Sequence, residues 1–131
     1  MTERVALLAG VGAVAGLGAA VAERFAREGF TAVVAARTRE NLDTVVARIN
    51  DHGAKAYAVV ADASREEQVV SLIDQAETIG PIHVAVYNAG GNRPSKSLNT
   101  SGDFFEQMWR VGTYGDFVFG REAVKRMLPR G

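Results

Sequence analysis

Apolar residues along this chain are concentrated in short runs, separated by longer stretches in which apolar and polar positions alternate. The runs cover residues 5–9, 31–36, 54–61 and 82–87. The run at 5–9 has no polar interruption, which is typical of a strand buried on both faces of a sheet, and the other runs are mainly apolar. The sequence therefore predicts four buried strands.

The stretches between the runs have apolar residues three or four positions apart, which predicts amphipathic helices. In the first stretch Leu17, Val21 and Phe25 form the apolar stripe, and Gly29 follows where a helix would end. Strand, glycine-rich turn and helix thus come in the order expected of a β-α unit.

The next two helices carry their own start and stop signals. Thr38 is placed to cap the second helix and Gly53 to end it. Ser64 and Glu67 have the spacing of a capping box for the third helix, and Gly80 precedes a proline at its end. After the fourth strand we expect a polar surface loop over 92–101.

Two further helices are expected in the last part of the chain, a short one over 103–110 and a longer one over 113–128. Strands that alternate with helices indicate parallel strands joined by right-handed crossovers. We therefore predict an α/β fold with a doubly wound parallel sheet of the Rossmann type and strand order 3-2-1-4, in one domain over 1–131.

Composition narrows the range of functions. The 131 residues carry 15 basic and 15 acidic side chains, so we expect neither a nucleic acid nor a membrane as partner. With no cysteine and only two distant histidines, the chain offers no disulfide and no metal site. The absence of cysteine is compatible with a cytoplasmic location.

The turn after the first strand is rich in glycine. Such a turn lets the backbone approach a pyrophosphate, while the N–H groups and dipole of the following helix stabilise its charge. Small residues at this position also serve close packing, which is the competing interpretation. The candidate pyrophosphate residues are Gly10, Gly12, Gly16, Leu17 and Gly18.

The second strand ends in a basic sequence, Ala36-Arg37-Thr38-Arg39. A carboxylate at this place usually holds the ribose 2′-hydroxyl of NAD, whereas an arginine accommodates the 2′-phosphate of NADP. Arg37 and Thr38 therefore favour NADP over NAD. The alternative is that both arginines are merely solvated at the start of a helix.

Polar and small residues also follow the third and fourth strands. Asp62, next to Ala63, could accept a hydrogen bond from an adenine amino group or could be an ordinary loop residue. Asn88-Ala89-Gly90 leaves room for a cofactor, and its amide could tie adjacent strands together even without a ligand.

With these motifs in place, the chain resembles the N-terminal half of a short-chain dehydrogenase/reductase from Arg4 to its last residue. The resemblance implies hydride transfer between a nicotinamide cofactor and a carbonyl or alcohol. It places pyrophosphate on the glycine turn, the 2′-phosphate on Arg37 and Thr38, adenine on Asp62 and Ala63, and the adjacent ribose on 88–90. It also implies subunit contacts through the long last helix, and so a homo-oligomer.

Three departures from the family pattern limit this inference. The glycine turn is two residues longer than usual if it starts at Gly10, the register that leaves the first strand a normal length. Gly112 stands where the family has an asparagine that supports a proton relay. The catalytic serine and the Tyr-x-x-x-Lys pair are absent, and Tyr87 is better explained by packing than as a replacement acid.

We therefore expect the cofactor-binding portion of an NADP-dependent oxidoreductase, incomplete at its C-terminus and inactive alone, with no catalytic residue assigned. A non-catalytic dinucleotide-binding or interaction module is the second hypothesis. The sequence argues against it, because the last helix would then expose apolar residues that no later strand covers, namely Phe117, Phe119, Val124 and Met127. Methyltransferase-type cofactor binding is a third, but it leads one to expect an acid at the end of the second strand, where Arg37 stands.

Overall fold

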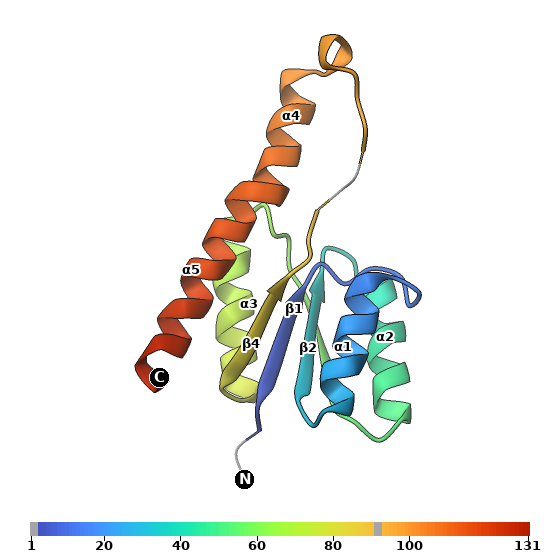
Figure 1. The fold of residues 1–131 in the computed structure, drawn as a ribbon, viewed down its shortest axis with the longest axis vertical. Helices are drawn as coiled ribbons and strands as arrows, with labels where there is room; N and C mark the ends of the chain where they lie inside the picture. Colours follow the sequence, from blue (N-terminus) through green and yellow to red (C-terminus); the bar gives the residue numbers. More distant parts are fainter. Residues whose placement is uncertain (1–2, 91–92) are drawn as a thin grey trace.

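A computed structural model of the chain describes residues 3–90 and 93–131. The start of the predicted polar loop, at residue 92, lies outside the described residues. The described parts form a three-layer α/β fold, with the sheet between two layers of helices (Figure 1). The predicted fold class is confirmed.

The sheet has four parallel strands in the order β3-β2-β1-β4, as predicted. Three strands have the predicted bounds, and β3 is shorter than the predicted 54–61 because it pairs with β2 only over its central residues. The strands are β1 (Val5–Ala9), β2 (Thr31–Ala36), β3 (Ala56–Val60) and β4 (Ile82–Tyr87).

Helices cover both faces of the sheet (Figure 1). On one face lie α1 (Leu17–Arg27) and α2 (Arg39–Asp51). On the other lie α3 (Glu66–Ile79) and α5 (Gly115–Met127), and α4 (Gly102–Trp109) extends past the carboxyl ends of the strands. Short 3-10 turns, η1 (Ser97–Asn99) and η3 (Leu128–Arg130), precede α4 and follow α5.

The alternation of side chains along β1 explains why the sheet needs helices on both faces. Leu7 belongs to the core beneath α3 and α5, and its neighbour Leu8 belongs to the core beneath α1 and α2. Both side chains are fully buried. On the α1 side the buried apolar residues of the helix, Ala19, Ala22 and Ala26, are all small, so that α1 packs close to the strands.

The stop signals act as predicted, whereas one start signal was wrong. Gly29 and Gly53 follow α1 and α2 with positive φ values of 94° and 84°, which glycine adopts without strain. Thr38 occupies the N-cap of α2, although its side chain makes no capping hydrogen bond. The predicted capping box of Ser64 and Glu67 does not form, because α3 starts one residue later, after Arg65, and the Ser64 hydroxyl donates to Asp62 instead.

The prediction of two separate helices at the end of the chain was also wrong. From Gly102 to Met127 the backbone is continuously helical, and a π-helical segment, η2 (Arg110–Tyr114), joins α4 to α5. Gly112 lies inside this segment with a helical backbone, and a glycine inside a helix costs only about 1 kcal/mol relative to alanine. Tertiary contacts around η2 outweigh that cost.

Gly115 is the residue at which the long helix touches the body of the protein most closely. A β-carbon at this position would overlap the carbonyl oxygen of Ala63 and the hydroxyl of Tyr87. Glycine is therefore required here by the close approach of helix and sheet rather than by backbone conformation.

We expect Gly115→Ala to lower the free energy of unfolding by about 1–3 kcal/mol, because an overpacked contact forces neighbouring atoms to move. Gly120 in the same helix has no neighbour within 4 Å of a β-carbon. The matched variant Gly120→Ala should instead raise the free energy of unfolding by up to ~1 kcal/mol. Urea denaturation of both variants measures the difference, and equal stabilities would contradict the contact.

Candidate functional site

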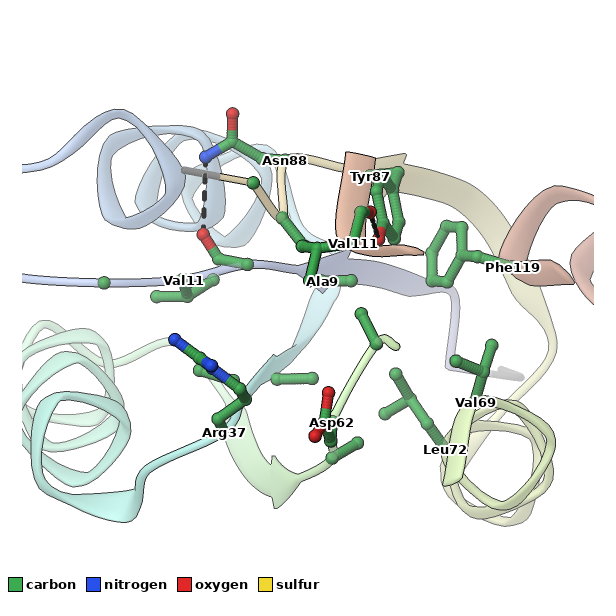
Figure 2. A pocket seen from close by; sticks show the side chains of 18 of the residues that line it. Ala9, Val11, Arg37, Asp62, Val69, Leu72, Tyr87, Asn88, Val111 and Phe119 are labelled. Carbon is green, nitrogen blue, oxygen red and sulfur yellow. Dashed lines mark hydrogen bonds between the residues drawn. The ribbon is translucent and has the colours of Figure 1, made fainter. Parts of the chain in front are cut away.

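A pocket of about 330 Å³ lies at the carboxyl ends of the strands. This is the edge of an open α/β sheet at which ligands bind, between strands whose connections run to opposite faces. Figure 2 shows Arg37 and Asp62 across the pocket from Asn88 and Tyr87. Nine of the twelve residues predicted from the sequence line it: Gly10, Gly12, Arg37, Thr38, Asp62, Ala63, Asn88, Ala89 and Gly90.

The glycine turn begins directly after β1, so the longer loop is the one that the structure adopts. Gly10 has a φ of 87°, and a β-carbon there would overlap the backbone of Asn88 and Ala89. Gly12 has no heavy atom within 4 Å of such a carbon, so its surroundings are open toward the pocket. Gly10 is thus fixed by packing, whereas Gly12 leaves space for a ligand.

The other three predicted turn residues do not line the pocket. The N–H of Gly16 donates to the carbonyl of Ala13, at 2.8 Å, and the Leu17 side chain is 69% exposed. Gly18 is buried, and a β-carbon on it would stand 2.9 Å from the Gly10 carbonyl oxygen. The backbone N–H groups of Leu17 and Gly18 begin α1, where an α-helix leaves its first donors without intrahelical partners.

Asn88 ties β4 to the glycine turn, as the sequence suggested for its amide. Its Nδ2 donates to the carbonyl of Gly10 at 3.3 Å, drawn as a dashed line in Figure 2. Its backbone N–H also donates to the carbonyl of Ala9, at 2.9 Å. The two hydrogen bonds hold the end of β4 beside the start of the turn.

The structure separates the two arginines at the end of β2. Arg37 lines the pocket together with Thr38 and Asn41. Arg39 does not line it, and its guanidinium forms an exposed ion pair with Asp43 at 3.3 Å, one turn along α2. Asn41 went unnoticed in the sequence, although its place in the first turn of α2 is the signal that could have found it.

Asp62 is held in place by the residues that follow it. Its Oδ1 accepts hydrogen bonds from the backbone N–H of Ser64 at 2.9 Å and from the Ser64 hydroxyl at 2.7 Å. Partial burial acts to raise the pKa of the Asp62 carboxyl, but the Ser64 hydrogen bonds and the charges of Arg37 and Arg65 outweigh it and hold the pKa below its usual value. The carboxylate is therefore ionised and available as an acceptor at neutral pH.

Tyr87 ends β4 with its hydroxyl turned toward the long helix. That hydroxyl donates to the carbonyl of Val111 in η2 (Figure 2), and the ring packs against Phe119 with centroids 5.4 Å apart. Burial, together with the negative charges of Asp116 and Asp62, raises the pKa of Tyr87 to about 12. The hydroxyl is thus a hydrogen-bond donor over the physiological pH range.

Part of the pocket consists of apolar side chains for which the sequence predicted no role in binding. One of them, Phe119, was expected to be uncovered on the last helix, but it is buried against the sheet. These side chains come from α3 and α5, on the side of the sheet opposite α1, and from α4 and η2. No local motif could have marked them, because they reach the pocket only through the packing of the helices. The additional lining residues with large apolar side chains are Val69, Leu72, Met108, Val111 and Phe119.

The residues present fit a dinucleotide. The pocket volume is within the range of about 300–1,000 Å³ for small-molecule sites. The unhindered backbone at Gly12 suits a pyrophosphate. The Arg37 guanidinium suits the phosphate of a phosphorylated ribose, and the Asp62 carboxylate can accept a hydrogen bond from an adenine amino group. In the described residues no group of three or more His, Asp or Glu side chains is placed to hold a metal ion.

Comparison with known proteins gives a consistent picture. Residues 5–131 match the family described as short chain dehydrogenase. Versicolorin reductase 1 of Dothistroma septosporum is 35% identical over 130 residues, which are 98% of this chain and 49% of that protein. An uncharacterised oxidoreductase of Mycobacterium tuberculosis is 37% identical over 102 residues, 77% of this chain and 38% of that protein.

Solved structures share the fold as well. A short-chain dehydrogenase from Rhodopseudomonas palustris superposes with a TM-score of 0.92 at 32% identity, covering 98% of this chain and 59% of that one. A variant of actinorhodin polyketide ketoreductase with NADPH has a TM-score of 0.90 at 27% identity, with 98% and 49% covered. The chain spans about half the length of the curated relatives that it matches.

In the part of the chain that the structure describes, no helix is long and apolar enough to cross a membrane.

The lowered pKa of Asp62 leads to a test of its surroundings. Its pKa in the folded protein lies below the ordinary value of 3.8, so the ionised carboxylate favours the folded state above about pH 4, and this contribution is lost as the pH falls through the folded pKa. We expect Ser64→Ala to raise the Asp62 pKa, because the hydroxyl no longer donates to it. NMR titration of the Asp62 carboxyl carbon measures this pKa. Ser71→Ala on the exposed face of α3 is the control, and an unchanged Asp62 midpoint in Ser64→Ala would contradict the assignment.

Proposed function

Because the chain belongs to the short chain dehydrogenase family, we propose that it forms the cofactor-binding half of an NADP-dependent oxidoreductase that transfers hydride between nicotinamide and a carbonyl or alcohol. The observation that carries the cofactor assignment is the placement of Arg37 in the pocket. Membership of this family also argues against methyltransferase-type cofactor binding. We place the protein in the cytoplasm on its lack of cysteine alone.

The proposed binding mode follows the order of the strands. The first N–H groups of α1, at Leu17 and Gly18, and the open backbone at Gly12 bind the pyrophosphate. Asp62, with Ala63, binds the adenine. The ribose next to nicotinamide lies against residues 88–90, where small side chains leave room for it.

NADP is favoured over NAD because a planar guanidinium binds a phosphate through two hydrogen bonds. Arg37 and Thr38 line the pocket and form the proposed 2′-phosphate site. No carboxylate ends β2 to accept the 2′-hydroxyl hydrogen bond that NAD would offer. When bound, the cofactor supplies or accepts the hydride.

The residues for proton transfer to substrate are missing from these 131 residues. None of the three tyrosines, Tyr57, Tyr87 and Tyr114, is followed four positions later by a lysine that could lower its pKa. Gly112 stands in place of the relay asparagine. We therefore propose that these residues bind the cofactor without turning over a substrate.

Arg37→Gln tests the cofactor assignment directly. We expect NADPH to bind roughly 10- to 100-fold more weakly, the loss of one or two charge-assisted hydrogen bonds, while NADH affinity stays unchanged. Isothermal titration calorimetry with both cofactors measures the two affinities. Arg39→Gln is the matched control, since Arg39 pairs with Asp43 and does not line the pocket. Tighter binding of NADH than of NADPH by the unmodified chain would overturn the NADP assignment.

A second candidate function, as an interaction module, is favoured by an exposed apolar stripe on the long helix. Trp109 and Phe117 are eight residues apart, a spacing that would turn the stripe by about 80° in a regular α-helix. The π-helical segment between them has more residues per turn and removes most of that rotation. The exposed residues of the stripe are Phe105, Trp109, Phe117, Val124 and Leu128.

We propose that two copies of the chain associate through this stripe, which would remove its apolar surface from water. Sedimentation equilibrium should give twice the chain mass of 14.0 kDa, and Phe117→Glu should shift the mass toward that of the monomer. The control variant Tyr57→Ser, at an exposed position on β3 outside the stripe, should leave the measured mass unchanged. A monomeric unmodified chain would contradict the proposal.

A further inference from the structure

The π-helical segment η2 exposes one backbone carbonyl to a partner from outside the helix. The N–H of Gly115 donates to the carbonyl of Arg110, five residues earlier. In a regular α-helix the same N–H would donate to Val111, four residues earlier. The hydroxyl of Tyr87 donates to the Val111 carbonyl (Figure 2).

Two other contacts attach the same segment to the loop after β3. The Nε of Arg110 donates to the carbonyl of Ser64 at 3.2 Å, and Ser64 in turn donates twice to Asp62. The backbone of Gly115, next to η2, lies against the carbonyl of Ala63 so closely that no side chain fits between them. The ends of β3 and β4 are therefore both connected to one short piece of helix.

These contacts involve residues that line the pocket. Tyr87, Val111 and Asp62 all line it, and Asp62 is the carboxylate proposed for the adenine. Val111 comes from η2, so any rotation of that segment moves a lining side chain. A carbonyl that lost the Tyr87 hydroxyl could recapture the N–H of Gly115, which would convert the π-helical turn into an α-helical one and rotate the residues around it.

The protonation of Tyr87 is suited to a fixed hydrogen bond. Its raised pKa, about 12, keeps the hydroxyl protonated at neutral pH. A general acid works best with a pKa near the pH of the reaction. The geometry of Tyr87 also indicates a structural role, because its hydroxyl already donates to a backbone carbonyl of the long helix.

We propose that Tyr87 is a positioning residue for the nucleotide, and that its hydrogen bond to Val111 holds η2 in the π-helical form that shapes the adenosine end of the pocket. This inference rests on the proposed function. Arg110 is the second positioning residue, since its hydrogen bond to Ser64 connects the same segment to the Asp62 loop.

The test is Tyr87→Phe, which keeps the ring and removes the hydroxyl. We expect NADPH and adenosine 2′,5′-bisphosphate, which has no nicotinamide, to lose affinity by the same factor of roughly 3 to 10, the usual consequence of one lost hydrogen bond. Calorimetric titration gives both affinities. Tyr57→Phe, at a tyrosine outside the pocket, is the matched control and should bind both ligands as the unmodified chain does.

Arg110→Gln provides a second variant that leaves Tyr87 intact, and it should also weaken the binding of both ligands by the same factor.

Hydrogen exchange of backbone amides reports on the helix itself. In Tyr87→Phe the amides of residues 110–116 should change their exchange rates, while those at the C-terminal end of α5 keep theirs.

The outcomes distinguish the two proposals. If the unmodified chain binds neither nucleotide, the proposed function is wrong, and the exchange measurement alone decides whether Tyr87 holds η2. If it binds both and Tyr87→Phe binds them equally well, the positioning role is wrong. Ketone reduction by the unmodified chain that Tyr87→Phe abolishes would make Tyr87 a catalytic acid and would also overturn the inference.

Discussion

The close approach of the glycine turn to the end of β4 is the constraint on which the site depends. Gly10 packs against the backbone of Asn88 and Ala89 with no space for a β-carbon, and the Asn88 amide donates to the Gly10 carbonyl. This contact joins β1 to β4, where the chain crosses from one face of the sheet to the other. The pocket opens at this point because the connections diverge from it.

The long helix provides a second constraint, imposed from the other face of the sheet. Gly115 brings it against Ala63 and Tyr87, and η2 then carries Val111 to the pocket. The same π-helical segment brings the exposed apolar residues before and after it toward one face. One local change in helical geometry thus affects both the pocket and the surface that we propose for self-association.

Strands and their order were predictable from the sequence because mainly apolar runs and glycine stops are local signals. Three of the four strands have the predicted bounds. The capping box at Ser64 failed because Asp62, two residues earlier, competes for the same hydroxyl. The continuity of α4 and α5 could not be predicted locally, because the contacts that hold the segment between them come from residues distant in sequence.

By itself the sequence determined the fold class, the strand order and most residues at the carboxyl edge of the sheet, since each follows from short-range periodicity and turn chemistry. Only the tertiary structure decided that Arg37 lines the pocket while Arg39 pairs with Asp43. It also decided that apolar side chains such as Phe119 complete the pocket and that Tyr87 contacts the long helix. The direction of a side chain and the partner of a hydroxyl depend on which distant segments pack beside them, and no local pattern encodes that packing.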